Sequence, residues 1–128
     1  MRRILCLLAE LSAIAIVGIG GQCNTNPPLT PIKPMGPDTT WVGDTTHYRT
    51  AAYSPDAHAM CFVFDWGDGS RYDTTAYWHS WDTVSVTRVW PAVGEFEVRA
   101  KAIDDRGVGS PGWSVPLSVT VHPPHTER

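Results

Sequence analysis

One aromatic stretch in the middle of the chain constrains the fold more than any other feature. Within Met60–Ser70, aromatic side chains recur at every second position and a glycine-rich turn follows at once; the aromatic residues are Phe62, Phe64 and Trp66. Because side chains alternate between the two faces of a strand, these three rings point to one face. Large aromatic residues in this register are typical of a half-buried strand. The stretch therefore predicts a central strand of a β-sheet that ends at Gly67.

A tight turn follows this strand, with the sequence Gly67-Asp68-Gly69-Ser70. Its two glycines supply backbone angles that residues with a Cβ resist. The side chains of Asp68 and Ser70 can hydrogen-bond the amides that the turn leaves unpaired. An aromatic strand that ends in such a turn is the expected nucleus of a β-sandwich.

Alternating patterns elsewhere predict further strands. Apolar residues occupy every second position in Phe96–Ala102 and Val115–Val121, and also in Val84–Trp90 except at Arg88. Thr45–Ala52 is rich in β-forming residues, with Tyr48 as its inward-pointing side chain. Thr74–Trp81 is less regular and predicts a strand or an ordered loop. Since no amphipathic helical pattern stands out after the N-terminus, we expect an all-β domain built as a two-sheet sandwich.

The aromatic strand and its turn resemble the signature of PKD (polycystic kidney disease) domains, a family of Ig-like modules. The matching residues are Phe64, Asp65, Trp66, Gly67, Asp68, Gly69 and Ser70. A second block resembles the family's aromatic residue, glycine turn and closing aspartate and glycine; its residues are Trp90, Gly94, Phe96, Asp104 and Gly107. The resemblance covers residues 37–122 and implies one Ig-like β-sandwich. It also implies that Asp65 and Asp68 are structural residues that satisfy backbone amides around the turn.

The N-terminal residues have the composition of an export signal. A basic start, Met1-Arg2-Arg3, precedes the mostly apolar Ile4–Ile19, which is short for a membrane span and is interrupted by Glu10. Residues 1–22 are therefore interpreted as a signal peptide. Cys23 follows directly and resembles the lipid-modified first residue of a bacterial lipoprotein.

A proline-rich segment comes next. With four prolines, the segment 24–34 cannot form regular structure, so residues 23–36 are predicted to carry the lipid and form an extended, semi-rigid tether. Residues 123–128 are a short tail. These features predict an exported protein of the bacterial cell envelope, held to the membrane through a lipid on Cys23. An ordinary cleaved signal peptide, which would give a secreted protein, is the alternative.

The interpretation of the cysteines depends on this choice. If Cys23 is acylated, Cys61 is a lone thiol on the face of its strand opposite the three aromatic rings. If Cys23 is not acylated, a disulfide between Cys23 and Cys61 becomes an option, although a proline-rich spacer gives no reason to expect the required geometry.

The sequence lacks the pattern of a catalytic or nucleic-acid-binding site. Ser70 does not have the Gly-x-Ser-x-Gly frame of a nucleophile elbow. Positive charges are scattered among the acids of a chain whose formal net charge is -3. His58 and Cys61 lack the second pair of ligands that a zinc site needs. We expect no enzyme activity, no nucleic-acid partner and no cofactor, with calcium as an alternative through three acids in turns: Asp44, Asp104 and Asp105.

Aromatic residues carry the functional prediction. Tyr77, Trp78 and Trp81 crowd one segment, with Trp78 in the opposite phase from the other two. Surface rings can stack on the faces of sugars, and exposed apolar patches mark contact sites. We expect a non-catalytic binding or spacer module whose partners are envelope proteins or polysaccharide. The alternatives are a carbohydrate-binding module that uses these rings and a calcium-stabilised structural module of a secreted protein.

Overall fold

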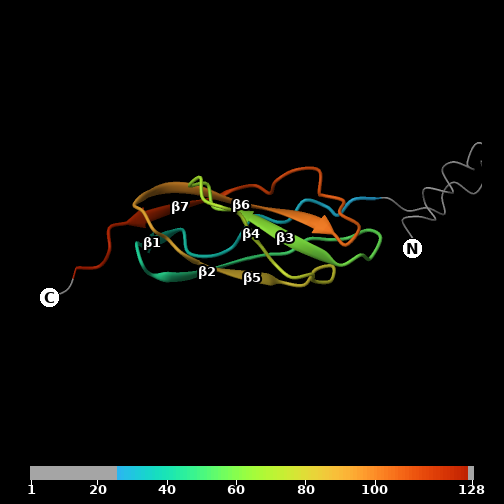
Figure 1. Ribbon diagram of the computed structural model, residues 1–128, viewed down its shortest axis with the longest axis horizontal. Coiled ribbons are helices and arrows are strands. Elements are labelled where there is room, and N and C mark those ends of the chain that lie inside the picture. Colours follow the sequence, from blue (N-terminus) through green and yellow to red (C-terminus); the bar gives the residue numbers. More distant parts are fainter. Residues whose placement is uncertain (1–25, 127–128) are drawn as a thin grey trace, which may run out of the picture.

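Within residues 26–126, seven β-strands form two sheets that enclose one core (Figure 1). The structure, a computed structural model, describes residues 26–126. The strands are β1 (Thr39–Trp41), β2 (Thr45–Thr50), β3 (Met60–Asp65), β4 (Asp73–Thr74), β5 (Val84–Val89), β6 (Gly94–Asp104) and β7 (Leu117–His122). Within the described residues there is no helix of the length and hydropathy needed to cross a membrane. The prediction of an all-β, two-sheet domain is confirmed.

The larger sheet has the strand order β1-β7-β6-β3-β4, and the smaller sheet pairs β2 with β5. All pairs are antiparallel except β1 with β7. The long strand β6 pairs with two neighbours in turn: Gly94–Val98 pairs with β7, and Arg99–Asp104 pairs with β3. The two sequence blocks that carry the PKD resemblance therefore lie next to each other, with Asp65 directly opposite Arg99.

The rings of the aromatic strand lie in the core. Phe62, Phe64 and Trp66 are fully buried. The ring of Trp66 packs on Tyr48 of β2 and on Trp90, which follows β5, with centroid separations of 5.7 and 5.9 Å. Because Tyr48 and Trp90 belong to the smaller sheet and its continuation, the Trp66 indole joins the two sheets.

Two segments contain less β-structure than the alternation predicts. β7 begins at Leu117, and Val115 lies outside it with 66% of its surface exposed. Pro116, between them, has no N–H to donate to the ladder, which explains the late start. The segment 74–81 contains only the last residue of β4 and one bridge, between Trp78 and Met60; the rest is loop.

Residues 26–36 lie against the domain, whereas the sequence predicts that they are part of an extended, semi-rigid tether. At every third position an amide donates to the chain of β2 and its continuation: Leu29, Ile32 and Met35 donate to the carbonyl oxygens of Tyr53, Ala51 and Arg49 at 2.9, 3.0 and 2.8 Å. Pro28, Pro31 and Pro34, which each come one residue before one of these donors, are buried. Three residues per turn is the period of the polyproline II helix, so one face of the segment packs while one edge donates hydrogen bonds. The segment thus covers an edge of β2 that would otherwise present unpaired backbone groups.

Replacing Trp66 with alanine is expected to lower the free energy of unfolding by about 3–5 kcal/mol, because a large buried ring leaves a cavity between the sheets. Urea unfolding followed by circular dichroism measures this. Val115→Ala, at a largely exposed position, is the matched control and should unfold like the wild type. A wild-type transition for Trp66→Ala would show that this ring does not hold the sheets together.

Candidate functional site

Asp65, at the end of β3, and Asp68, in the turn that follows, stabilise that turn through hydrogen bonds to its backbone. Asp65 Oδ1 accepts a hydrogen bond from the amide of Gly67 at 2.9 Å, and Asp68 Oδ1 accepts one from the amide of Ser70 at 3.0 Å. Both carboxylates thus satisfy backbone amides, which is the role that the resemblance implies. Asp65 and Asp68 therefore act as structural residues and do not form a catalytic acid–base pair with each other.

Arg88, which sequence reasoning did not single out, ties this turn to the core. Its guanidinium forms an ion pair with Asp68 and lies 5.1 and 5.0 Å from the ring centroids of Trp66 and Trp90. Burial of Asp68 opposes its ionisation. Hydrogen bonds from Ser70 and the charge of Arg88 outweigh that effect and hold the pKa of Asp68 below its usual value.

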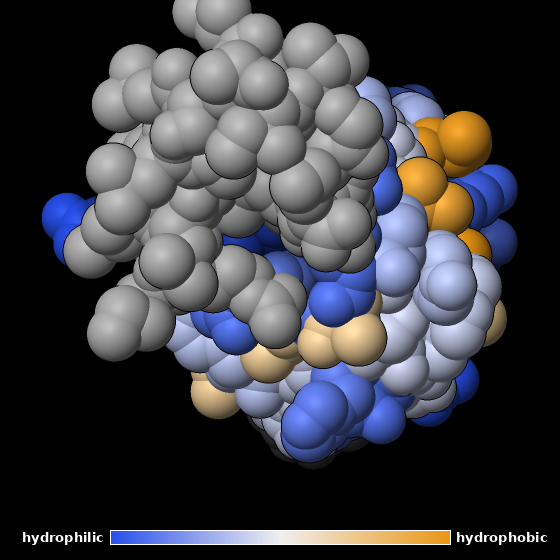
Figure 2. Space-filling view, turned by 90° about the vertical axis from the view of Figure 1, so that its right-hand side faces the viewer, coloured by the Kyte–Doolittle hydropathy of each residue, from blue (hydrophilic) through white to orange (hydrophobic). Residues whose placement is uncertain are grey.

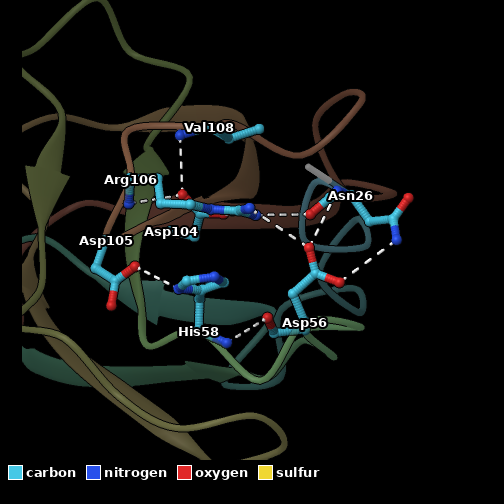
Figure 3. A network of polar contacts seen from close by, with 8 residues as sticks. Asn26, Asp56, His58, Asp104, Asp105, Arg106 and Val108 are labelled. Atoms are coloured by element: carbon cyan, nitrogen blue, oxygen red, sulfur yellow. Dashed lines mark hydrogen bonds and ion pairs between the residues drawn. The ribbon is translucent and has the colours of Figure 1, made fainter. Parts of the chain in front are cut away.

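A second ion cluster lies at the opposite end of the domain, where β3 begins and β6 ends (Figure 3). We call it the Arg106 cluster; its members are Asn26, Asp56, Asp104 and Arg106. The guanidinium of Arg106 contacts Asp104 at 2.7 Å and Asp56 at 3.4 Å, and it donates to the carbonyl oxygen of Asn26 at 2.9 Å. The amide of Asn26 donates to Asp56 at 3.1 Å. The cluster therefore fixes the first described residue to the loops that follow β2 and β6.

Asp104 also caps the end of β6. Its Oδ1 accepts hydrogen bonds from the amides of Arg106 and Val108 at 2.9 and 3.0 Å, as its position at a strand end predicts. The side chain is fully buried, which opposes ionisation, but the hydrogen bonds and the charge of Arg106 hold the pKa of Asp104 below its usual value. Arg106 lies two residues beyond Asp104 in the same turn, whereas Asp56 comes from a distant loop and could not be predicted as a member of the cluster from a local sequence pattern.

The three acids considered for calcium do not form one group. Asp44 lies at the end of the domain where β2 begins, and it contacts His125 at 2.8 Å. Asp104 belongs to the Arg106 cluster, and Asp105 contacts His58 at 2.8 Å. In the part of the chain that the structure describes, no three His, Cys, Asp or Glu side chains are grouped so that they could hold a metal ion.

The pair of His58 and Asp105 resembles a base and its orienting acid but lacks a nucleophile. His58 Nε2 is enclosed and has no hydrogen-bond partner among the described residues. The nearby hydroxyl of Ser54 accepts from the backbone amide of His58 and not from its ring. Burial raises the pKa of the free Cys61 thiol, which keeps it protonated. Nucleophilic catalysis needs a nucleophile within reach of a base, and no hydroxyl or thiol of the described residues hydrogen-bonds the His58 ring.

Tyr77, Trp78 and Trp81 are all exposed, but the structure does not gather them on one surface. Their exposed fractions are 57, 39 and 58%. Trp78 lies directly opposite Met60 and shares its face of the sheet, so Tyr77, the preceding residue, points to the other face. The ring of Trp81 pairs instead with Tyr53, at a centroid distance of 6.1 Å. The three residues therefore cannot act as one stacking platform.

The outer face of the larger sheet carries a hollow of about 490 Å³. The Arg99 guanidinium lies there, 4.5 Å from the ring centroid of Trp113, and contacts Asp65 at 2.9 Å. Tyr72 meets the Trp113 ring edge-on at 5.4 Å. The lining residues are Asp65, Gly67, Glu97, Arg99, Trp113, Ser114 and Pro116. The hollow thus combines an aromatic ring with charged hydrogen-bonding groups. Sequence reasoning missed it because Trp113 and Asp65 are far apart in the chain.

A second hollow, of about 420 Å³, lies at the end of the domain where β7 ends. Trp41 lines it, and its ring stacks on His125 with centroids 5.1 Å apart. The other lining residues are His122, Pro123, Pro124 and Thr126. Residues of the predicted tail therefore contact the domain.

No protein-family model and no curated protein matches this sequence. Solved structures do match. The PKD domain of an M14-like peptidase from Thermoplasmatales archaeon SCGC AB-540-F20 is 28% identical, with a TM-score of 0.67 over 77% of this chain and 99% of that one. The CARDB domain of the PF1109 protein from Pyrococcus furiosus, determined in complex with di-metal ions, is 12% identical, with a TM-score of 0.55 over 80% and 99%. The second similarity concerns the fold alone.

The two packed sheets and these neighbours define an Ig-like β-sandwich. Within that class, the folded part of this chain is a PKD-like domain. PKD domains are non-catalytic modules, so the domain belongs to a class that serves in protein interaction or as a spacer.

Stability is expected to fall in acid. The pKa values of Asp68 and Asp104 are lowered in the folded protein, so their contribution is complete above the unfolded pKa and is lost as pH falls through the folded pKa. Urea unfolding between about pH 7 and pH 2 should show a decline that begins near pH 4. Asp104→Asn should cost roughly 1–3 kcal/mol at neutral pH and flatten this decline. A variant with the wild-type slope would exclude Asp104 as a source of the acid sensitivity.

Proposed function

We propose that this chain is an exported bacterial lipoprotein whose PKD-like domain serves as a non-catalytic binding or spacer module of the cell envelope. The observation that carries the proposal is the order of the parts. An export-type segment, residues 1–22, is followed by Cys23, and Asn26, three residues further on, is already in contact with the domain. The segment 1–22 and Cys23 lie outside the described residues, so the lipid attachment is inferred from the sequence.

The proposed partners are other proteins of the envelope. The domain offers exposed apolar side chains on several separate surfaces, which is typical of a module that makes contacts. The proposal includes membrane attachment through Cys23 and involves no cofactor and no nucleic acid.

The intact mass of the mature protein tests the attachment. The full chain is expressed in a bacterial host, and the protein is analysed from membrane and soluble fractions. We expect a membrane-bound species that begins at Cys23 and carries the mass of acyl chains. Cys23→Ser should remove the acyl mass and the membrane association together. A soluble wild-type species cleaved at another residue would contradict the proposal and favour a secreted module.

Polysaccharide is the second candidate partner, and the hollow beside Trp113 supports it. An indole ring flanked by Asp65, Glu97 and Arg99 supplies a stacking surface and hydrogen-bonding groups for hydroxyls, which is the chemistry that a sugar requires. The exposed ring of Trp81 belongs to a different surface and is not part of this candidate site.

Titration of soluble glucans, chitooligosaccharides and peptidoglycan fragments against tryptophan fluorescence tests this second candidate. If the hollow binds one of them, the Trp113→Ala variant should lose the response, whereas Trp41→Ala, at the other hollow, should retain it. Circular dichroism shows that both variants are folded. Binding that survives in Trp113→Ala, or no response of the wild type to any glycan, would exclude the hollow as a site for these sugars.

A further inference from the structure

One end of the domain holds the start of the described chain, and we call it the Asn26 end. In Figure 1 the blue start of the chain and the arrowhead of β6 lie at this end, and the C terminus lies at the other. The Arg106 cluster fixes Asn26 there through its backbone carbonyl and amide. The chain therefore enters the domain at a defined point and not through a long free tether.

The short distance along the chain from Cys23 to this point limits how far the domain can stand from a membrane. Cys23 precedes Asn26 by three residues. Three residues in a fully extended chain span at most about 11 Å. The headgroup layer outside the hydrocarbon core is itself about 5–8 Å thick on each side. A lipid on Cys23 would consequently keep the Asn26 end at the headgroups.

The Asn26 end carries three exposed large apolar side chains on neighbouring stretches of chain: Leu29, Tyr53 and Trp81. They are 49, 41 and 58% exposed. The amide of Leu29 donates to the carbonyl oxygen of Tyr53 at 2.9 Å, and the rings of Tyr53 and Trp81 lie 6.1 Å apart. Leu29 follows Asn26 by three residues, which corresponds to about 9 Å at the rise of a polyproline II helix.

The backbone at Trp81 is held in a conformation that residues other than glycine rarely adopt, with φ at 67°. A hydrogen bond from the Trp81 amide to the carbonyl oxygen of Ala52, at 2.8 Å, fixes it there. One residue further on, Asp82 accepts from the amide of His79 at 2.9 Å and closes the loop. This strain does not bring the indole into the core, since the ring stays mostly exposed. Residues held in such sparsely populated backbone regions cluster at functional sites such as active sites, ligand clamps and switch regions.

We propose that Leu29, Tyr53 and Trp81 rest on the lipid surface and orient the domain on the membrane. The inference depends on the lipid attachment proposed above. Tyrosine and tryptophan favour the boundary between lipid and water, because a ring can enter the headgroup layer while its polar group stays hydrated. Figure 2 looks onto the Asn26 end; the part of the surface that is not grey is mostly blue to white, with the strongest orange at the right and paler orange near the centre and lower left. Such a surface suits shallow contact and not deep insertion.

The charges at this end indicate that the contact does not depend on anionic lipid. The exposed acids Asp82 and Asp105 each lie beside a histidine, His79 at 3.5 Å and His58 at 2.8 Å. Arg106 is engaged by buried carboxylates. There is no cluster of exposed cations among the described residues here to attract negative headgroups. The contact should therefore form on zwitterionic lipid.

Quenching of tryptophan fluorescence by brominated lipid tests the proposal. The acylated full chain is purified from host membranes and reconstituted into phosphatidylcholine vesicles, with or without bromine on the acyl chains near the headgroups. We expect the brominated lipid to quench the wild type. Trp81→Phe should reduce that quenching at least about twofold, because Trp81 is the ring placed at the interface. Trp41→Phe, at the opposite end of the domain, is the matched control and should leave the quenching unchanged.

The outcomes separate this inference from the proposed function. Acylated protein that floats with the vesicles, but whose quenching is absent or equally strong in Trp81→Phe, overturns the orientation and leaves the lipid attachment intact. Protein that carries no acyl mass and does not float overturns both. Quenching that falls in Trp41→Phe and not in Trp81→Phe shows that the opposite end faces the lipid, which also contradicts the inference.

Discussion

The contact between the buried Trp66 indole and its neighbours connects the two sheets and the turn that follows β3. The ring packs on Tyr48 and Trp90 from the smaller sheet, and its indole N–H donates to Asp73 of β4 at 2.8 Å. Arg88 lies over the same ring and pairs with Asp68 in the turn that follows Trp66. Core packing and turn geometry are therefore coupled through one residue. That coupling gives a physical reason why an aromatic strand and an acidic glycine turn occur together in this sequence.

The alternation of apolar and polar side chains predicted the main strands, because it depends only on which residues of one segment are buried. Phe62, Tyr48 and Val98, for example, are fully buried. The Arg106 cluster was not predictable in this way. Asp56 and Arg106 come from separate loops and meet only because β3 and β6 pair in one register. The hollow beside Trp113 depends on the same kind of long-range pairing. The three exposed aromatic residues of the segment 74–81 were read as one group, but a loop lets neighbours in sequence point in different directions.

The proline-rich segment is where sequence and structure differ most. Prolines exclude a helix and a regular ladder, and the segment was therefore interpreted as a spacer. The missed signal is the spacing of Pro28, Pro31 and Pro34, which matches the three-residue turn of a polyproline II helix that can pack one face. With this segment on the edge of β2, the domain no longer stands away from Cys23. A module with its lipid at the Asn26 end would leave the hollow beside Trp113, on the side of the sandwich, and the surface around Trp41, at the far end, open to partners.

The claim that residues 26–36 belong to the domain is tested most directly by amide hydrogen exchange in the full chain. Leu29, Ile32 and Met35 donate to carbonyl oxygens of the segment 49–53, so these amides should exchange slowly, at rates close to those of the β2 amides. Thr30 and Lys33, the two residues between them that have an amide hydrogen, do not donate such a hydrogen bond and should exchange faster. Exchange of all three amides at the rate of an unstructured peptide would mean that the segment is a free tether. In that case a lipid on Cys23 would not hold the domain at the membrane surface.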